Sequence, residues 1–411
     1  MADFIVGSVV TEKSDFWFRK QFLRDLWRSI QKHNVLLIAP RRIGKTSVMY
    51  RLLDAPKDKW LVIHLNVEEL KTAGDFVISL VDAIREHQPN YFRDTLARGW
   101  GFLKGLFARI EKIEAYEFKV ELRKSDDFKE KWEERATELI DQIAGSRDKV
   151  LFIIDELPDM LNAMFSHAPD EYETFLHWFR KTRERSLLCN VRWLVGGSIN
   201  LVASLDQQGK VKLINDLKPE LLMPFSLGEV EEFVSRMFKK NRVPFDNTVI
   251  PRIHELLGSP IPYFLQMLTQ ELCRKWKHDR MGTMTAETVT EVFNKTLLGE
   301  MARDKLQHYR SRINLHYQQG EQEAACYLLN KLSLSDDGIS RSTLVQLYRQ
   351  IEEKKMHRRT GQTLTEAFQR LLMYLQSDFY IEETKTDHYD FASRLLKTWW
   401  KKYYGYESGD N

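Results

Sequence analysis

A lysine and two hydroxyl residues begin a helical pattern directly after a glycine and a short apolar run. The run Val35–Ile38 has the composition of a buried strand, and Val48, Met49 and Leu52 recur after it at helical spacing. Between such a strand and helix, backbone N–H groups and the positive end of the helix point at one place, which suits phosphate oxygens. The residues expected around that place are Pro40, Arg41, Arg42, Ile43, Gly44, Lys45, Thr46 and Ser47.

Two of these side chains have specific chemistry. Lys45 is expected to neutralise the β- and γ-phosphates of a nucleotide, and the Thr46 hydroxyl is expected to ligate magnesium. The segment departs from the pattern G-x-x-x-x-G-K-[ST] at its first position, where Ala39 replaces glycine. A short Gly-Lys-Thr match is also compatible with a surface turn, so it does not establish a nucleotide site by itself.

Two adjacent carboxylates, Asp155 and Glu156, follow a second apolar run, Val150–Ile154, 110 residues after Lys45. At the carboxyl end of a parallel strand, Asp155 can hold the magnesium shell while Glu156 polarises the attacking water. An acidic turn after a strand is common in isolation. Because both motifs occur in this order on one strand pattern, the sequence predicts a P-loop NTPase that hydrolyses a nucleotide with Mg²⁺.

Apolar runs alternate with helical patterns through the first half of the chain, which is typical of a parallel sheet covered by helices. We therefore predict an α/β fold with the parallel sheet of a P-loop NTPase. Alternating apolar and charged residues over Ile110–Arg123 indicate a hairpin inserted between sheet elements. The expected strands are Val35–Ile38, Leu61–Leu65, Val150–Ile154, Arg192–Val195 and, more weakly, Leu221–Met223; the helices between them are Thr46–Leu53, Phe76–Glu86, Phe128–Ile143 and Glu171–Glu184.

After Pro224 the pattern is helical. Ser226 and Glu229 form a capping box ahead of an amphipathic helix. From Glu321 the order becomes three helices, a hairpin and a helix, which indicates a winged helix. The predicted domains are an ATPase domain at 1–224, a helical lid at 225–310 and a winged helix at 311–411.

Composition excludes several classes of protein. The 411 residues include 62 Lys and Arg against 59 Asp and Glu, a net charge of +3, so no strong field draws the whole chain to nucleic acid. No apolar stretch approaches the roughly 20 residues that span a bilayer, and the N-terminus lacks the features of a signal peptide. Three scattered cysteines share no metal-ligand spacing. We expect a cytoplasmic protein without membrane contact.

The segment Asn34–Ser47 resembles the archaeal-type ATPases related to the STAND and AAA+ classes, which typically carry Pro-Arg-Arg-x-Gly-Lys-Thr-Ser. The resemblance covers nearly the whole chain, although only this loop and the Asp155–Glu156 strand are specific. It implies that the N-terminal segment folds over the adenine, which adds Val10 to the site. It also implies that Ser198 senses the γ-phosphate and that Pro260, in a Gly-x-Pro motif of the lid, touches the nucleotide.

Three arginines, Arg180, Arg183 and Arg185, lie near the end of the helix before the fourth strand. In oligomeric relatives, arginines near this place reach the γ-phosphate of a neighbouring subunit. Cations at a helix C-terminus also suit its dipole without any further role. Two interpretations are therefore left open. The protein forms a homo-oligomer in which one of these arginines acts in trans, or the arginines only stabilise the C-terminus of the helix.

The predicted winged helix raises the question of DNA binding. Residues 321–411 contain 13 Lys and Arg and 14 Asp and Glu, a net charge of −1, whereas duplex binders concentrate positive charge. The candidate recognition helix, Thr365–Gln376, carries Arg370 as its one cation, and a basic cluster at 354–359 lies in the loop before it. Contact with a protein is therefore favoured over DNA.

Together these features predict a nucleotide-dependent molecular switch for an unidentified protein partner, with slow ATP hydrolysis as its timer. One alternative is a DNA-dependent AAA+-type ATPase that assembles on duplex DNA. Another is a nucleotide-binding regulatory subunit of an antiviral defence system. Glu156 argues against a pure scaffold, because a scaffold does not need a carboxylate that activates water.

Overall fold

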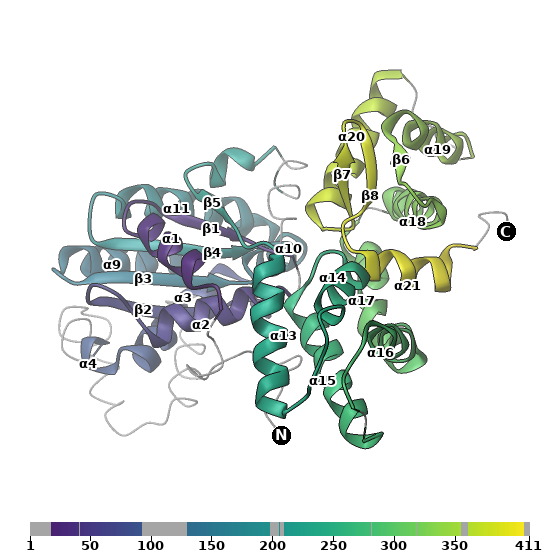
Figure 1. Cartoon of the computed structure of the whole chain (residues 1–411). Coiled ribbons are helices and arrows are strands. Elements are labelled where there is room, and N and C mark those ends of the chain that lie inside the picture. The colour runs from purple at the N-terminus through teal and green to yellow at the C-terminus, as the bar shows by residue number, and fades with distance from the viewer. Residues whose placement is uncertain are drawn as a thin grey trace. The chain divides into compact units, whose positions relative to one another are not determined.

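The structure, a computed structural model, describes residues 18–40, 42–92, 130–197, 205, 209–280, 282–317, 319–354 and 361–406. These residues form two compact units that divide between Leu222 and Met223 (Figure 1). No helix within these ranges has both the length and the apolar composition needed to cross a membrane. The hairpin predicted over Ile110–Arg123 lies outside the described residues.

The first unit is built on a five-stranded parallel sheet with the order β2-β3-β4-β1-β5. Its strands are β1 (Val35–Ile38), β2 (Trp60–Asn66), β3 (Lys149–Asp155), β4 (Val191–Gly197) and β5 (Lys218–Leu221). Because all strands run in the same direction, β1 and β3 end at the same edge of the sheet. In open α/β sheets, ligands bind outside this carboxyl edge.

The fifth strand lies earlier in the chain than the sequence predicts, at Lys218–Leu221 rather than Leu221–Met223. Its pairing with β1 continues to the N–H of Leu222, which donates to Ile38 O at 2.8 Å. β5 is an edge strand on which three of the four residues are exposed. An edge position accepts proline and charged residues, so β5 lacks the apolar run that reveals the buried strands.

Helices flank this sheet (Figure 1). An aromatic cluster of Phe76, Phe175, Trp178, Phe179 and Trp193 joins two of the helices to β4, and each of these side chains is at most 4% exposed. This packing fixes the strands whose ends carry the chemistry. The helices of the unit are α1 (Lys20–Ile30), α2 (Lys45–Asp54), α3 (Ala73–His87), α4 (Pro89–Tyr91), α9 (Trp132–Gly145), α10 (Leu157–His167) and α11 (Pro169–Ser186), with a 3-10 turn, η2 (Val211–Ile214), before β5.

The second unit begins with helices only. They are α13 (Leu227–Asn241), α14 (Val249–Leu257), α15 (Pro262–His278), α16 (Ala286–Val292) and α17 (Glu300–His316), with a π-helical turn, η3 (Phe293–Leu297), before α17. The capping box predicted ahead of α13 is present: the Ser226 hydroxyl accepts the Glu229 N–H, and Glu229 Oε2 accepts the Ser226 N–H at 2.9 Å. α17 runs across residue 310, where the sequence places the end of the lid, and that boundary stays a prediction.

The rest of the second unit is a winged helix. Its elements are α18 (Gln319–Leu334), β6 (Ile339–Ser340), α19 (Arg341–Glu353), α20 (Gly361–Ser377), β7 (Ile381–Lys385), β8 (His388–Phe391) and α21 (Arg394–Tyr404). The three strands pair antiparallel in the order β6-β8-β7. α21 closes the domain with Trp399 and Trp400, both fully buried, and Trp400 Nε1 donates to Asn330 Oδ1 at 2.8 Å.

The turn after α14 is bonded to the segment that begins α21. Gly258 has a φ of 70°, and a Cβ built there would lie 2.7 Å from the backbone nitrogen of Arg394. The neighbouring Ser259 hydroxyl donates to the carbonyl oxygen of Ala392. Glycine is therefore required at position 258 by backbone conformation and by space. The turn Gly258–Pro260 is therefore hydrogen-bonded to the segment between β8 and α21.

Candidate nucleotide-binding site

The turn between β1 and α2 changes the direction of the chain through two left-handed residues, Arg42 and Gly44, with φ of 62° and 94°. A Cβ at Gly44 would meet nothing within 4 Å, so backbone conformation rather than space favours glycine there. Ile43, between them, is 1% exposed and anchors the turn in the core. Pro40 and Ser47 are also buried, Arg42 is exposed, and Arg41 lies outside the described residues.

Lys45, the first residue of α2, contacts both carboxylates at the end of β3. Its Nζ lies 2.9 Å from Asp155 Oδ1 and 3.0 Å from Glu156 Oε1. The Thr46 hydroxyl donates to the second Asp155 oxygen, Oδ2, at 2.9 Å. The structure thus brings these four predicted residues together, because β1 and β3 end at the same edge of the sheet.

The charge of Lys45 is set by two opposing effects. Burial alone would lower the pKa of Lys45, because desolvation disfavours the ammonium ion. The nearby Asp155 and Glu156 carboxylates outweigh burial and raise the pKa of Lys45 above its ordinary value, so the side chain is a cation at physiological pH. The Asp155 side chain is only 2% exposed, so water screens this attraction little. A fixed cation at a helix N-terminus is the electrostatic arrangement that binds phosphate groups.

The two carboxylates differ in exposure. Asp155 is held on both oxygens, because Oδ1 also accepts the backbone N–H of Glu156 at 3.0 Å. Glu156 has a left-handed φ of 60°, a conformation that costs about 1 kcal/mol in a non-glycine residue, and its side chain is 27% exposed. A buried, immobile carboxylate suits a metal ligand, whereas an accessible one suits a base that acts on water.

Residues on the neighbouring strands β2 and β4 complete the surroundings of Asp155, and the sequence does not single them out. Asn66 lies opposite Asp155 in the β2–β3 register. His64, two residues earlier, is 7% exposed, and its ring contacts Tyr50 of α2 in a tilted arrangement with 4.7 Å between ring centroids. Burial lowers the pKa of His64, an effect that Asp155 partly opposes, so the imidazole is neutral near pH 7. On the other side, β4 contributes Gly196, whose lack of a side chain leaves room for the Asp155 carboxylate.

Val10, Ser198 and Pro260 are the other residues predicted for this site. Val10 and Ser198 lie outside the described residues, although β4 ends one residue before Ser198. Pro260 is buried in the second unit, where its carbonyl oxygen accepts the N–H of Phe225 at 3.1 Å. The parts assigned to these residues at the site stay predictions.

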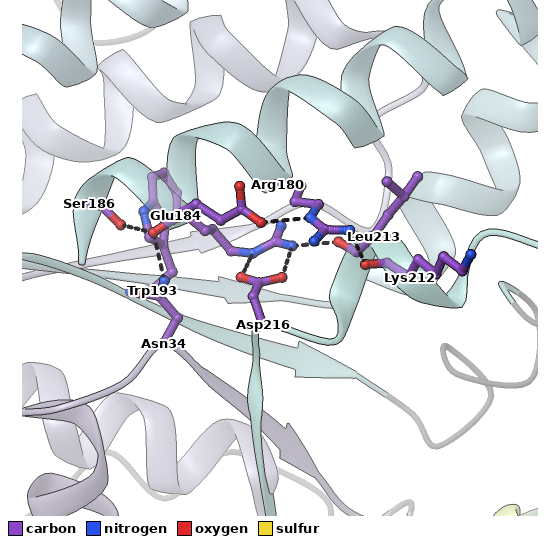
Figure 2. Close-up of polar contacts among 9 residues, drawn as sticks. Asn34, Arg180, Glu184, Ser186, Trp193, Lys212, Leu213 and Asp216 are labelled. Atoms are coloured by element: carbon purple, nitrogen blue, oxygen red, sulfur yellow. Dashed lines mark hydrogen bonds and ion pairs between the residues drawn. The ribbon is translucent and has the colours of Figure 1, made fainter. Parts of the chain in front are cut away.

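The α11 residue Arg180 belongs to the polar network shown in Figure 2, where Arg180 Nη1 donates to Lys212 O. Arg183 is 0% exposed, and its Nε and Nη2 donate to the two oxygens of Asp216 at 2.9 and 2.8 Å. Its Nη2 also donates to Leu213 O at 2.6 Å. Of the three arginines left open for a part in trans, Arg183 is the least suited to it, because its guanidinium is buried and bonded within its own unit.

Arg180 and Arg185 are more exposed than Arg183. Arg180 Nε donates to Glu184 Oε1 at 2.8 Å, and Arg185 Nη2 donates to Asp141 Oδ1 at 2.6 Å. α11 ends shortly before β4 begins, so its end lies at the amino edge of the sheet, opposite to the edge that carries Lys45. A part in trans for Arg180 or Arg185 stays a prediction.

The strand order, the turn between β1 and α2 and the acidic end of β3 define a P-loop ATPase fold. Solved structures with this architecture include a Walker-type ATPase of Pyrococcus abyssi, with a TM-score of 0.60, 17% identity and coverage of 95% of this chain and 97% of that chain. At this identity the likeness shows the fold alone.

Two further solved structures align less well. The ORC2 protein of Aeropyrum pernix in its ADPNP–ADP complexes has a TM-score of 0.44 and 11% identity, covering 95% of this chain and 92% of that chain. The RuvB Holliday junction branch migration motor of Thermotoga maritima has a TM-score of 0.40 and 10% identity, covering 90% and 91%. Comparison of the sequence with protein families and with curated proteins gives no match.

Proposed function

We propose that this protein is a Mg²⁺-dependent ATPase of the archaeal AAA+ type, with ATP bound at the turn between β1 and α2. The observation that supports it is the cluster of Lys45, Thr46, Asp155 and Glu156. This cluster supplies a phosphate-binding cation, two oxygens for a metal and an accessible base at one edge of the sheet. The fold shared with a Walker-type ATPase is consistent with it.

The residues present suit the expected ligands. Thr46 and Asp155 offer a hydroxyl and a carboxylate oxygen 2.9 Å apart, and Mg²⁺ prefers such hard oxygen donors. Lys45 and the first N–H groups of α2 would bind phosphate oxygens, and Glu156 would orient the attacking water and accept its proton. Mg²⁺, when bound, supplies neutralisation of the phosphate charge. The other predicted contacts are Pro40, Arg41, Arg42, Ile43, Gly44 and Ser47 around the phosphates, Ser198 at the γ-phosphate, and Val10 and Pro260 at the rest of the nucleotide.

ATP binding and slow hydrolysis would act as a switch for a protein partner in the cytoplasm. Exchange of ADP for ATP would reorient the lid and the winged helix and so expose a surface for that partner. The bond between Ser259 and Ala392 supports this proposal, because it ties the lid turn that contains Pro260 to the winged helix. A regulatory subunit of an antiviral system would use the same site and differ in its partner.

The rival function, a DNA-dependent AAA+-type ATPase, is weakened by the contacts of Arg370. Arg370 Nε lies 3.2 Å from Glu321 Oε1, and the Glu321 side chain is 0% exposed. The one cation predicted for the recognition helix, α20, is thus paired with an acid of its own domain, while its side chain stays 35% exposed. A helix whose one cation is paired with an acid of the same domain has little positive charge left to bind DNA phosphates.

Nucleotide binding is tested with Lys45→Ala, measured by titration calorimetry with ATP and Mg²⁺. Loss of a buried cation from a charge pair costs about 2 kcal/mol or more, so the Kd for ATP should rise by about 30-fold or more. The control is Lys149→Ala, which removes an exposed lysine at the opposite end of β3 and should leave the Kd unchanged. Near-unchanged ATP affinity in a folded Lys45→Ala protein would contradict the assignment of the nucleotide-binding site.

A further inference from the structure

A glycine lies where β4, α2 and the end of β3 meet. Gly196 lies on β4 beside Asp155, and three atoms surround the place where its Cβ would be. An added Cβ would overlap the methyl group of Met49 from α2. It would also lie 2.9 Å from Asp155 Oδ1 and 3.3 Å from the carbonyl oxygen of Ile154.

Backbone conformation does not explain this glycine. Gly196 is in a regular strand, and it is not among the residues with a positive φ, so alanine can adopt its backbone without strain. Gly44 presents the opposite case, because it has a φ of 94° and open space around its Cβ position. The requirement for glycine at position 196 is therefore one of contact with its neighbours.

The two close neighbours respond differently to an added methyl group. The Met49 methyl is the far end of a flexible side chain, which moves at little cost. Asp155 Oδ1 is not free to move, because it bonds both Lys45 Nζ at 2.9 Å and the backbone N–H of Glu156 at 3.0 Å. Any displacement of this oxygen also turns Oδ2 away from the Thr46 hydroxyl.

We infer that Gly196 is a positioning residue for the metal site, which acts by leaving room for the Asp155 carboxylate between Lys45 and Thr46. This inference rests on the proposed function and deepens it, since it adds a residue of β4 to the requirements for Mg²⁺ binding. A methyl group at position 196 displaces the oxygen pair formed by Thr46 and Asp155 while leaving the phosphate-binding turn intact.

The test compares ATP affinity with Mg²⁺ and in EDTA, using titration calorimetry on the full chain. The ratio of the Kd in EDTA to the Kd with Mg²⁺ measures how strongly the metal strengthens ATP binding. This ratio does not depend on turnover. For Gly196→Ala we expect the Kd in EDTA to stay within about 3-fold of wild type, while the ratio falls by about 10-fold, which corresponds to ~1.4 kcal/mol. Gly145→Ala is the matched control, because a Cβ at Gly145 in the same unit meets nothing within 4 Å.

A second variant keeps the inference falsifiable if Gly196→Ala folds poorly. Gly196→Ala combined with Met49→Ala removes the overlap with α2 and leaves the contacts with Asp155 Oδ1 and the carbonyl oxygen of Ile154. Because Met49 is buried, the reference for stability is Met49→Ala alone. We expect the double variant to melt no lower than that single variant and still to lack the wild-type Mg²⁺ ratio. Recovery of the ratio, or a wild-type ratio in the folded single variant, would overturn the inference. Absence of any Mg²⁺ effect in wild type would instead refute the proposed function.

Discussion

Replacement of Arg183 is expected to destabilise the first unit strongly. The Arg183 side chain is 1% exposed and that of its partner Asp216 is 9% exposed, so solvent screens this pair little. Arg183→Ala removes the two bonds to Asp216 and the bond to Leu213 O, and it leaves the Asp216 carboxylate buried without its cation. Breaking a buried ion pair in this way costs about 3–5 kcal/mol.

The expected loss is large enough to measure by thermal unfolding. For a unit of this size, 1 kcal/mol shifts the melting temperature by roughly 2–4 °C, so Arg183→Ala should lower it by ~6–20 °C. Arg185→Ala is the control, because its pair with Asp141 is about half exposed, at 52% and 48%, and such a pair contributes ~1 kcal/mol or less.

A double variant separates the structural role of Arg183 from a catalytic role in trans. Arg183→Met with Asp216→Leu replaces both charges by apolar groups, which is often neutral for stability. We expect this protein to recover most of the lost melting temperature and to hydrolyse ATP at the wild-type rate. A small change for Arg183→Ala, below about 1 kcal/mol, would refute the structural reasoning. A folded double variant without activity would restore the trans interpretation.

Two further predictions concern the second unit. Gly258→Ala should lower the stability of this unit by about 1–3 kcal/mol in thermal unfolding, because Gly258 has a φ of 70° and its Cβ would meet Arg394. Gly228→Ala is the control, because a Cβ there meets nothing within 4 Å, and it should change stability by less than about 1 kcal/mol. Equal effects of the two substitutions would contradict this prediction. In fluorescence anisotropy, the full chain with ATP should bind duplex DNA no more tightly than a Kd of about 10⁻⁶ M at physiological salt, because Arg370 is paired with Glu321. The binding should weaken further as the salt concentration rises. Nanomolar, sequence-selective binding would favour the DNA-dependent ATPase.

The sequence predicts the main features of the site because they depend on local pattern and one topological rule. Val35–Ile38 and Val150–Ile154 are apolar runs, and each lies within a strand of the sheet. Since parallel strands end at one edge, Lys45 and Asp155 were expected to be neighbours although 110 residues separate them, and the structure places them 2.9 Å apart. β5 was misplaced because an edge strand carries no such apolar run.

Features that depend on tertiary packing could not be predicted in the same way. The cations of α11 look alike in the sequence, and only the folded chain brings Asp216 to Arg183, which buries that arginine and leaves Arg185 exposed. The requirement at Gly196 has no local signal either, because it arises from Met49 and Asp155 on two other elements. A strand pattern reveals that a residue is buried but not which atoms surround it.

The central claim, hydrolysis of ATP with Glu156 as the base, is tested most directly by phosphate release from wild type and Glu156→Gln at saturating ATP and Mg²⁺. The amide keeps the shape of the side chain but does not accept a proton, so turnover should fall by about 10²- to 10⁴-fold while ATP affinity is kept. Glu134→Gln, an exposed acid on α9, should retain full turnover. Wild-type protein that binds ATP without releasing phosphate, or Glu156→Gln with undiminished turnover, would contradict the account.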